Sequence, residues 1–215
     1  MTRPHLDGLV VAPGDEQSFL KAIGEVSRVA GYLADDAIVG GRVRKEIGGG
    51  ICYASTALYR AVFRAGLPIL ERHPHSLLID GRSAMPGFDA AVYSPSMDLR
   101  WRNDTPHPVM VAASLDTASS AISVELWGIG DGRSVAVRGP TIRNRRPAPA
   151  DTWRYDAALR AGHSRRIAQG SEGMDVTIGR VVRDAGGQTL RQETFRTRYK
   201  PHGALYVYGP GVTPP

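Results

Sequence analysis

The chain has 215 residues, 42% of them hydrophobic, which is enough for one packed core, or for one core with a small appended module. The formal charge of +6 comes mainly from arginines spread along the chain, and no nucleic-acid-binding motif accompanies them, so no nucleic-acid partner is expected. A single cysteine excludes an intramolecular disulfide framework and a multi-cysteine zinc site, and no stretch is apolar enough to span a bilayer.

The positive charge fits attraction to an anionic surface, such as a cell wall or membrane face, and equally a genome that favours arginine codons. The first residues, Met1-Thr-Arg-Pro-His, lack the apolar core of an export signal, so we expect no signal peptide in this chain. Neither observation gives the oligomeric state.

The first fifty residues predict a strand, a helix and a hairpin. Leu9–Ala12 is an apolar run that a Pro-Gly turn ends. Asp15 or Ser18 is placed to cap a helix, whose apolar residues recur at helical spacing until about Gly31. A hairpin is expected around the pair at 40–41, because the residues that follow alternate in polarity.

Three consecutive glycines, 48–50, lie just before Cys52, and a helix is predicted from about Cys52 to Ala65. Gly66 is its expected C-terminal stop, with Pro68 directly beyond. The helical spacing assigns the buried face to Ile51, Ser55, Leu58 and Val62, and the free face to Tyr53, Thr56, Ala57, Tyr59 and Arg60.

After Pro68 the chain consists of short apolar runs separated by turn residues about every ten residues, which predicts an antiparallel sheet. A long two-stranded ribbon is expected after residue 164, turning at residues 185–187; it should pack on the main body or on a partner, because an isolated ribbon is marginally stable. We therefore predict an α+β fold, with two helices packed on a mainly antiparallel sheet, followed by a small all-β ribbon module. The predicted parts are 7–139, a connecting segment at 140–163, and the ribbon module at 164–208.

Several stretches, in one order along residues 7–113, resemble the VanW family, which is named for an accessory gene of B-type vancomycin resistance clusters. They are Asp7–Asp15, GGGIC at 48–52, STALYRAVFRAGLPILERHPHS at 55–76, GFDAAVY at 87–93 and DLRWRNDT at 98–105. The family usually has glutamine after the cysteine, where this chain has Tyr53. The ribbon, from about 160 to 201, resembles the small glycine-rich β domain that often follows VanW domains in bacterial surface proteins.

The resemblance implies a bacterial cell-envelope or extracellular setting and peptidoglycan, or another wall component, as partner. It implies no particular reaction and no cofactor. The lack of a signal peptide leaves a cytoplasmic location open.

Cys52 is the first candidate for chemistry. A thiol in the first turn of a helix faces unpaired N–H groups and the positive end of the dipole, which favour the nucleophilic thiolate. The preceding glycines leave room for a substrate, and the N–H groups near Gly50 to Tyr53 could hold an oxyanion. The alternative is a small buried cysteine behind glycines that only allow close packing.

His75 and Asp89 are the candidate partners of the thiol. Both lie on predicted strands that follow the helix, so His75 could accept the thiol proton while Asp89 fixes the imidazole tautomer. This order is similar to that of transglutaminase-like and papain-like cysteine enzymes. The residues assigned to substrate contact are Gly48, Gly49, Gly50, Tyr53, Ser55, Glu71, Arg72 and Ser76.

Three other interpretations stay open. His73 and His75, with Asp89 or Asp80 and with Cys52 as a further candidate ligand, could bind one zinc ion. The glycine loop and the histidines could instead form a recognition groove of a non-catalytic module that binds peptidoglycan or glycan. His75 could simply bond a carbonyl, and Asp89 could cap a turn. Arg100 and Arg102 are expected on an exposed strand face, with Trp101 buried behind them.

Overall fold

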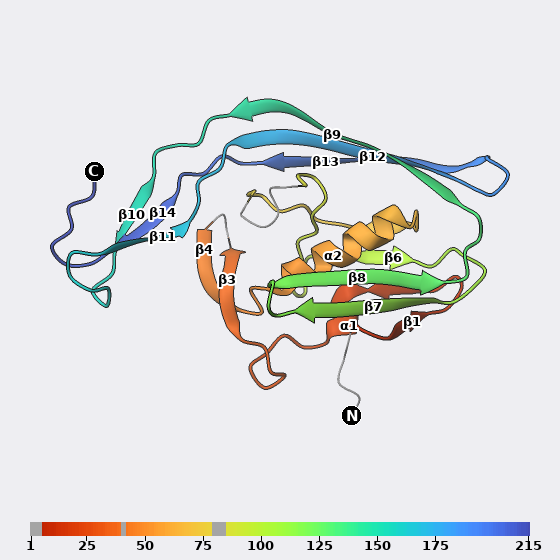
Figure 1. Ribbon diagram of the computed structural model, residues 1–215, viewed down its shortest axis with the longest axis horizontal. Helices are drawn as coiled ribbons and strands as arrows, with labels where there is room; N and C mark the ends of the chain where they lie inside the picture. The colour runs from red at the N-terminus through yellow and green to blue at the C-terminus, as the bar shows by residue number, and fades with distance from the viewer. Residues whose placement is uncertain (1–5, 40–41, 79–84) are drawn as a thin grey trace.

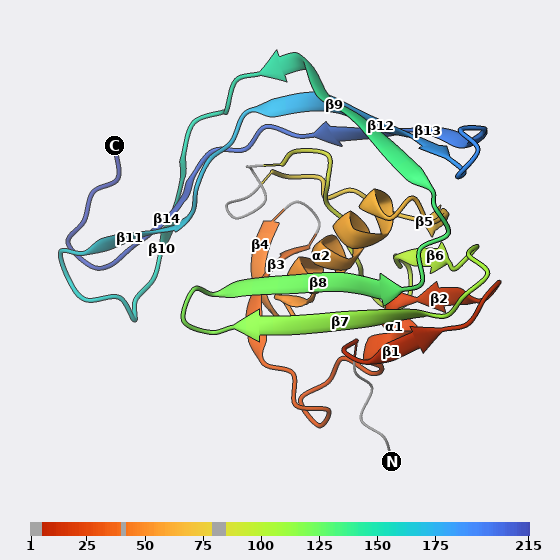
Figure 2. The same cartoon turned by 45° about the vertical axis from the view of Figure 1, so that its right-hand side comes forward.

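The computed structural model describes residues 6–39, 42–78 and 85–215, and it is built mainly of strands, with 44% strand and 10% helix (Figures 1 and 2). The predicted α+β arrangement of two helices packed on a mainly antiparallel sheet is therefore wrong. The described strands divide among four three-stranded sheets and one two-stranded hairpin. Frequent glycine and proline turns keep most strands short, so they form several small sheets rather than one platform.

Two of the small sheets lie in the N-terminal half, beside a hairpin. One has the order β1 (Leu9–Val11), β7 (Val109–Asp116), β8 (Ala121–Gly128), and another the order β2 (Glu16–Ser18), β6 (Arg100–Arg102), β5 (Ile69–Glu71). The hairpin is β3 (Ala34–Val39) with β4 (Arg42–Ile47), whose register confirms the predicted pairing, while the turn at 40–41 lies outside the described residues.

The C-terminal half contributes the other two sheets. The long one has the order β13 (Thr189–Tyr199), β12 (Gly173–Arg183), β9 (Ser134–Arg146), and the other the order β10 (Thr152–Tyr155), β14 (Leu205–Tyr208), β11 (Ser164–Ala168). The predicted ribbon is confirmed over β12 and β13, whereas residues 164–168, predicted as part of it, form β11 and pair with β14 in the other sheet. A third strand, β9, completes it and runs across the predicted boundary at residue 139. β10 lies within the segment predicted as a connection.

The helix α1 (Phe19–Ile23) is much shorter than predicted. Ser18, rather than Asp15, caps it by accepting a hydrogen bond from the backbone N–H of Lys21. Gly24 ends the helix after five residues with φ at 71°, a conformation that glycine adopts without strain.

The helix α2 (Ile51–Arg64) confirms the second predicted helix within a residue at each end, and Gly66 follows it at φ 71°. Its buried face is wider than predicted, since Thr56 and Tyr59 are buried. The reason is visible in Figures 1 and 2, where α2 lies between the β1–β7–β8 sheet and the β9–β12–β13 sheet. A helix covered on two sides must be apolar on both.

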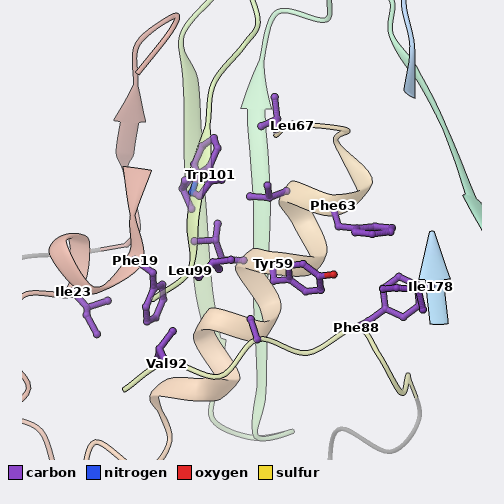
Figure 3. Packing of buried hydrophobic residues seen from close by; sticks show 14 of the residues in the cluster. Phe19, Ile23, Tyr59, Phe63, Leu67, Phe88, Val92, Leu99, Trp101 and Ile178 are labelled. Atoms are coloured by element: carbon purple, nitrogen blue, oxygen red, sulfur yellow. The ribbon is translucent and has the colours of Figure 1, made fainter. Parts of the chain in front are cut away.

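One hydrophobic core joins the two halves (Figure 3). Phe19 and Trp101 fill one side of α2, while Phe63 on the helix meets Phe88 edge to face, with ring centroids 5.3 Å apart. Ile178 of β12 belongs to the same cluster. The predicted face of β6 is confirmed, because Trp101 is fully buried while the arginines on either side of it are exposed.

Two stretches predicted as strands do not form strands in the described residues. Among the described residues, 75–78 form no bridge, and 88–94 make only isolated bridges, at Ala91 with His73 and at Tyr93 with Met97. The carbonyl of Ala90 instead accepts hydrogen bonds from Ser55 and Thr56 on α2, so side chains of the helix replace a neighbouring strand.

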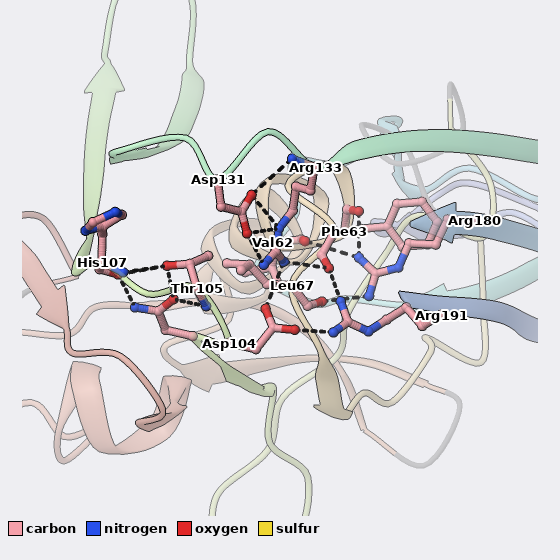
Figure 4. Close-up of polar contacts among 12 residues, drawn as sticks. Val62, Phe63, Leu67, Asp104, Thr105, His107, Asp131, Arg133, Arg180 and Arg191 are labelled. Atoms are coloured by element: carbon pink, nitrogen blue, oxygen red, sulfur yellow. Dashed lines mark hydrogen bonds and ion pairs between the residues drawn. The ribbon is translucent and has the colours of Figure 1, made fainter. Parts of the chain in front are cut away.

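Arg180 of β12 connects the β9–β12–β13 sheet, called the C-terminal sheet from here on, to the end of α2 (Figure 4). Its side chain is fully buried, and its guanidinium donates to the carbonyl oxygens of Phe63 at 2.6 Å and of Leu67 at 2.6 Å. Phe63 lies in the last turn of the helix and Leu67 just beyond it, where the helix dipole favours a cation; the Phe63 carbonyl also accepts from the N–H of Gly66 at 3.2 Å. The carboxylate of Glu193, 2.6 Å from Nε, balances the buried charge.

A second group of arginines binds the loop after α2 (Figure 4). Arg191 and Arg133 both pair with Asp104, and Arg191 also donates to the carbonyl of Gly66 at 2.5 Å. A Cβ on Gly66 would lie 2.8 Å from a methyl of Val135, so the close approach of the sheet requires glycine there. The two halves are therefore packed as one unit.

Replacing Arg180 should test this junction. We expect Arg180→Met to lower the free energy of unfolding by about 3 kcal/mol, because it removes the buried guanidinium that bonds the Phe63 and Leu67 carbonyls and the Glu193 carboxylate. Urea unfolding followed by tryptophan fluorescence measures this, with exposed Arg183 on the same strand, changed to Met, as the control. Equal effects of the two changes would contradict the proposed role of Arg180 at the end of α2.

Candidate functional site

His75 and Asp89 lie together, as the sequence predicted. The ring Nδ1 of His75 is 2.6 Å from Oδ2 of Asp89, and the backbone N–H of His75 donates to the same oxygen at 2.7 Å. Both residues are buried, with 8% and 2% of their surfaces exposed. An ionised carboxylate only accepts, so the proton lies on Nδ1, and a neutral ring then keeps its lone pair on Nε2, as a general base requires.

The other oxygen of Asp89 is held equally firmly. Oδ1 accepts from Arg72 at 3.1 Å and from the hydroxyl of Tyr199 at 2.5 Å. Burial alone raises the pKa of Asp89, but the hydrogen bond from His75 and the charge of Arg72 outweigh it and hold the pKa well below its usual value. Asp89 is therefore ionised at neutral pH.

Tyr199 is the site residue that sequence reasoning missed. It comes from β13, 110 residues after Asp89, and its hydroxyl also accepts from the backbone N–H of Gly87 at 2.8 Å. Burial and the charge of Asp89 raise its pKa far above the usual value, so it stays a neutral donor. Its only signal in the sequence is the alternation of Phe195, Thr197 and Tyr199, which places all three on the inner face of β13.

Arg72, assigned above to substrate contact, is engaged inside the protein. Its Nε donates to the carbonyl of Asp89 at 2.7 Å, and its Nη1 donates to Thr197 of β13 at 3.0 Å. The guanidinium also lies over the ring of Tyr59, 5.2 Å from the centroid. Arg72 therefore supports Asp89 and ties it to the C-terminal sheet.

Cys52 lies in the first turn of α2 and is half-buried. Its Sγ is 3.6 Å from the carbonyl oxygen of Val92, with the thiol as donor. The next turn of the helix bonds the same segment, because Ser55 donates to Ala90 at 2.7 Å. Residues 89–92 thus run along the start of α2.

The histidine segment lies along the other edge of residues 89–92. The N–H of Ala91 donates to the carbonyl of His73 at 2.7 Å, while the carbonyls of Ala90 and Val92 face α2. Alternate residues of an extended chain point their backbone groups to opposite edges. Cys52 contacts Val92, and His75 contacts Asp89. Val92 and Asp89 are three residues apart, which corresponds to roughly 10 Å along an extended chain. Cys52 and His75 thus contact opposite edges of the short segment that contains Asp89.

The glycine run has a packing role at its first position. Gly48 has φ 78°, and a Cβ there would lie 2.5 Å from methyl carbons of both Ile51 and Val26. Two N–H groups considered for an oxyanion are in use, because Ile51 donates to the carbonyl of Gly48 and Tyr53 to that of Gly50, each at 3.0 Å. The N–H of Gly49 donates to the backbone carbonyl of Glu46 at 3.2 Å.

The remaining predicted residues differ in exposure. The side chain of Tyr53 is 42% exposed, whereas Ser55 is fully buried. Ser76 is exposed, and its carbonyl accepts from the N–H of Lys200 at 2.8 Å. Glu71 accepts from the ring Nε2 of His73 at 2.9 Å, and this hydrogen bond is the main reason that the pKa of Glu71 is lowered.

The zinc alternative gains no support from the described ranges. Within 6–39, 42–78 and 85–215, no group of three or more His, Cys, Asp or Glu side chains is placed to hold a metal ion. Asp80, one of its proposed ligands, lies outside the described residues. In those same ranges, no helix has the length and apolar character needed to cross a bilayer.

Comparison with known proteins places this arrangement in a family. Residues 1–127 match the family described as "VanW like protein", which is more than half of the chain. The chain belongs to the VanW family. The predicted resemblance is thereby confirmed, and the residues around Cys52, His75 and Asp89 lie within the matched part.

Two curated VanW-like relatives match the same half. The "Uncharacterized protein YoaR" of Bacillus subtilis (strain 168) is 34% identical over 119 residues, covering 55% of this chain and 39% of the relative. The "Vancomycin B-type resistance protein VanW" of Enterococcus faecalis (strain ATCC 700802 / V583) is 26% identical over 114 residues, covering 52% of this chain and 42% of the relative. The chain therefore spans about two fifths of the length of these relatives.

Among the solved structures that match this VanW family member, one covers a shorter stretch of the chain. "Crystal structure of HP0197-G5" is 22% identical and covers 36% of this chain and 97% of its own, with a TM-score of 0.18. A TM-score this low carries no argument about fold or function.

The glycine run offers a matched test of packing. Gly48→Ala should destabilise the protein by at least about 1 kcal/mol more than Gly14→Ala, because both positions have φ near 80° but only Gly48 has neighbours that a methyl would strike. Urea unfolding of both variants measures the difference. Equal losses would show that the backbone conformation alone requires glycine at position 48.

The lowered pKa of Asp89 predicts acid sensitivity. A carboxylate whose pKa is lower in the folded state contributes stability that is present above its unfolded pKa, about 3.9, and is lost as pH falls below that. Urea unfolding from pH 6 to pH 2.5 should therefore show a fall in stability that is smaller in Asp89→Asn, which starts less stable. Asp15→Asn, an exposed control, should keep most of the fall. An unchanged fall in Asp89→Asn would contradict this assignment.

Proposed function

We propose that this chain is a cysteine-dependent hydrolase or acyl-transferase of the bacterial cell envelope, acting on peptide bonds of peptidoglycan. Cys52 is the nucleophile, His75 the base and Asp89 the residue that orients the imidazole. The observation that carries this proposal is the His75–Asp89 pair, with 2.6 Å between Nδ1 and Oδ2, preformed beside the segment that the thiol contacts.

The proposed chemistry needs no cofactor. Nε2 of His75 takes the thiol proton, the thiolate sulfur attacks the peptide carbonyl carbon, and His75 returns the proton to the leaving amine. The resulting thioester is then cleaved by water in a hydrolase, or by a second amine in an acyl-transferase. The step requires Nε2 and Sγ to come within hydrogen-bonding reach in the substrate complex.

The envelope setting and the substrate class rest on family membership. The Enterococcus faecalis relative carries a vancomycin-resistance name, which supports a connection with the cell wall. This chain covers only part of that relative, so the bond that is cleaved is identified by experiment rather than by transfer from the name.

A second candidate is a non-catalytic wall-binding or scaffolding module. Four hydrogen bonds converge on Asp89, which is the usual environment of a structural buried charge. The thiol donates to a backbone carbonyl, and Tyr53 replaces the glutamine that is usual in the family. These features favour a structural role for Cys52, His75 and Asp89 over a catalytic one.

Alkylation of the single cysteine distinguishes the two candidates. If Cys52 is activated, iodoacetamide should label it at pH 6 at least about tenfold faster than a peptide thiol, whose pKa is about 8.5, and His75→Ala should remove that advantage. His163→Ala, an exposed histidine, is the control. Labelling no faster than the peptide, in a protein that urea unfolding shows to be folded, would leave only the scaffolding function.

A further inference from the structure

The C-terminal sheet has a hollow on the face opposite α2. We call it the ribbon hollow; it measures about 170 Å³, and its lining includes Arg138, Thr141, Thr177, Gly179, Gln192 and Thr194. A cavity of roughly 150 Å³ admits a small organic molecule, so the ribbon hollow has room for more than one water.

The hollow faces outward because side chains alternate along β12. Ile178 and Arg180 point into the core, so Thr177 and Gly179 point away from it. Figures 1 and 2 show α2 on the inner side of this sheet, and the His75–Asp89 pair contacts that inner side through Tyr199. The ribbon hollow is therefore separate from the candidate catalytic residues.

Two glycines create the space. Gly179 has no side chain in the middle strand, and a Cβ there would lie 3.0 Å from the carbonyl oxygen of Glu193 and 3.9 Å from the hydroxyl of Thr194. On β9 the pairing shifts between the partners of Thr177 and Gly179, which leaves Gly139 in a bulge at φ 88°. A missing side chain beside a bulge produces a depression in an otherwise regular sheet.

Five of the eleven lining residues carry side chains that can donate hydrogen bonds on the outer face, and the lining also includes Ile178, Val181 and two glycines. Three threonine hydroxyls and the amide of Gln192 surround Gly179, and Arg138 adds a guanidinium. The one carboxylate residue in the lining, Glu193, points its side chain to the other side of the sheet, where it is 2.6 Å from Nε of Arg180. Throughout the described part of the chain, no carboxylate lies within ion-pair distance of Arg138.

We propose that the ribbon hollow binds a small oxyanion group, a carboxylate or a phosphate. A guanidinium and several hydroxyls around one open space can donate to each oxygen of such a group, and hydrogen bonds to an ionised acceptor are the strong ones. The lining residues Arg138, Gln192 and Thr194 are exposed to solvent, so the anion can be the exposed end of a larger molecule.

Titration followed by amide NMR tests the proposal on the whole chain, with inorganic phosphate and acetate in separate arms at constant ionic strength. Saturable shifts at Gly179 and Thr194 are expected with at least one anion, and the arm that saturates identifies the class. Arg138→Gln should weaken that binding by about tenfold or more, and Thr194→Val should weaken it less. Arg143→Gln, on the same strand and face but outside the hollow, should stay within about twofold.

Two results would overturn the proposal. One is the absence of saturable shifts at the hollow with either anion. The other is equal weakening by Arg138→Gln and Arg143→Gln, which would mean that the anions respond only to the general positive charge. Neither result depends on whether Cys52 is catalytic.

Discussion

A buried carboxylate is the constraint on which this structure depends. Asp89 is ionised and almost fully covered, and burying such a charge is costly unless donors surround it. Its donors come from two distant parts of the chain: Arg72 and His75 in one segment, and the hydroxyl of Tyr199 on β13. The histidine segment and strand β13 must therefore be in place together.

Further contacts of the C-terminal sheet pack the two halves of the chain as one unit. Arg180 caps the end of α2 from within the C-terminal sheet, while glycines at 66 and 87 let that sheet approach closely. At Gly87, a Cβ would lie 2.9 Å from a methyl of Val176. The part of the chain that carries the VanW match therefore does not complete its candidate site alone, since Tyr199 lies beyond that match.

This arrangement also limits how the candidate site can act. A histidine and carboxylate held by so many contacts are pre-organised, and little freedom remains to reorient the ring. The thiol, by contrast, is attached to the opposite edge of residues 89–92. If the site is catalytic, the movement that brings Sγ of Cys52 to Nε2 of His75 must occur at the start of α2 or on substrate binding. A scaffolding function needs no such movement.

Much of the site could be predicted because its chemistry is local. His75 and Asp89 follow Cys52 within forty residues, and the short motifs around them point to one family. Tyr199, Thr197 and Arg180 could not be assigned, because a tyrosine or arginine in an alternating strand has the same local pattern whether it faces solvent or a buried partner. Only the packing of distant strands identifies the partner.

Local sequence patterns were enough to predict the helix that begins beside Cys52, the ribbon of β12 and β13, the hairpin pairing and the VanW family. Glycine stops, alternation and short motifs act over only a few residues. The mainly β architecture and the third strand of the C-terminal sheet emerged only from the packing of the whole chain. The physical reason is that sheets form between residues far apart in the chain. Which strand pairs with which depends on the burial of the whole core, and no single segment encodes it.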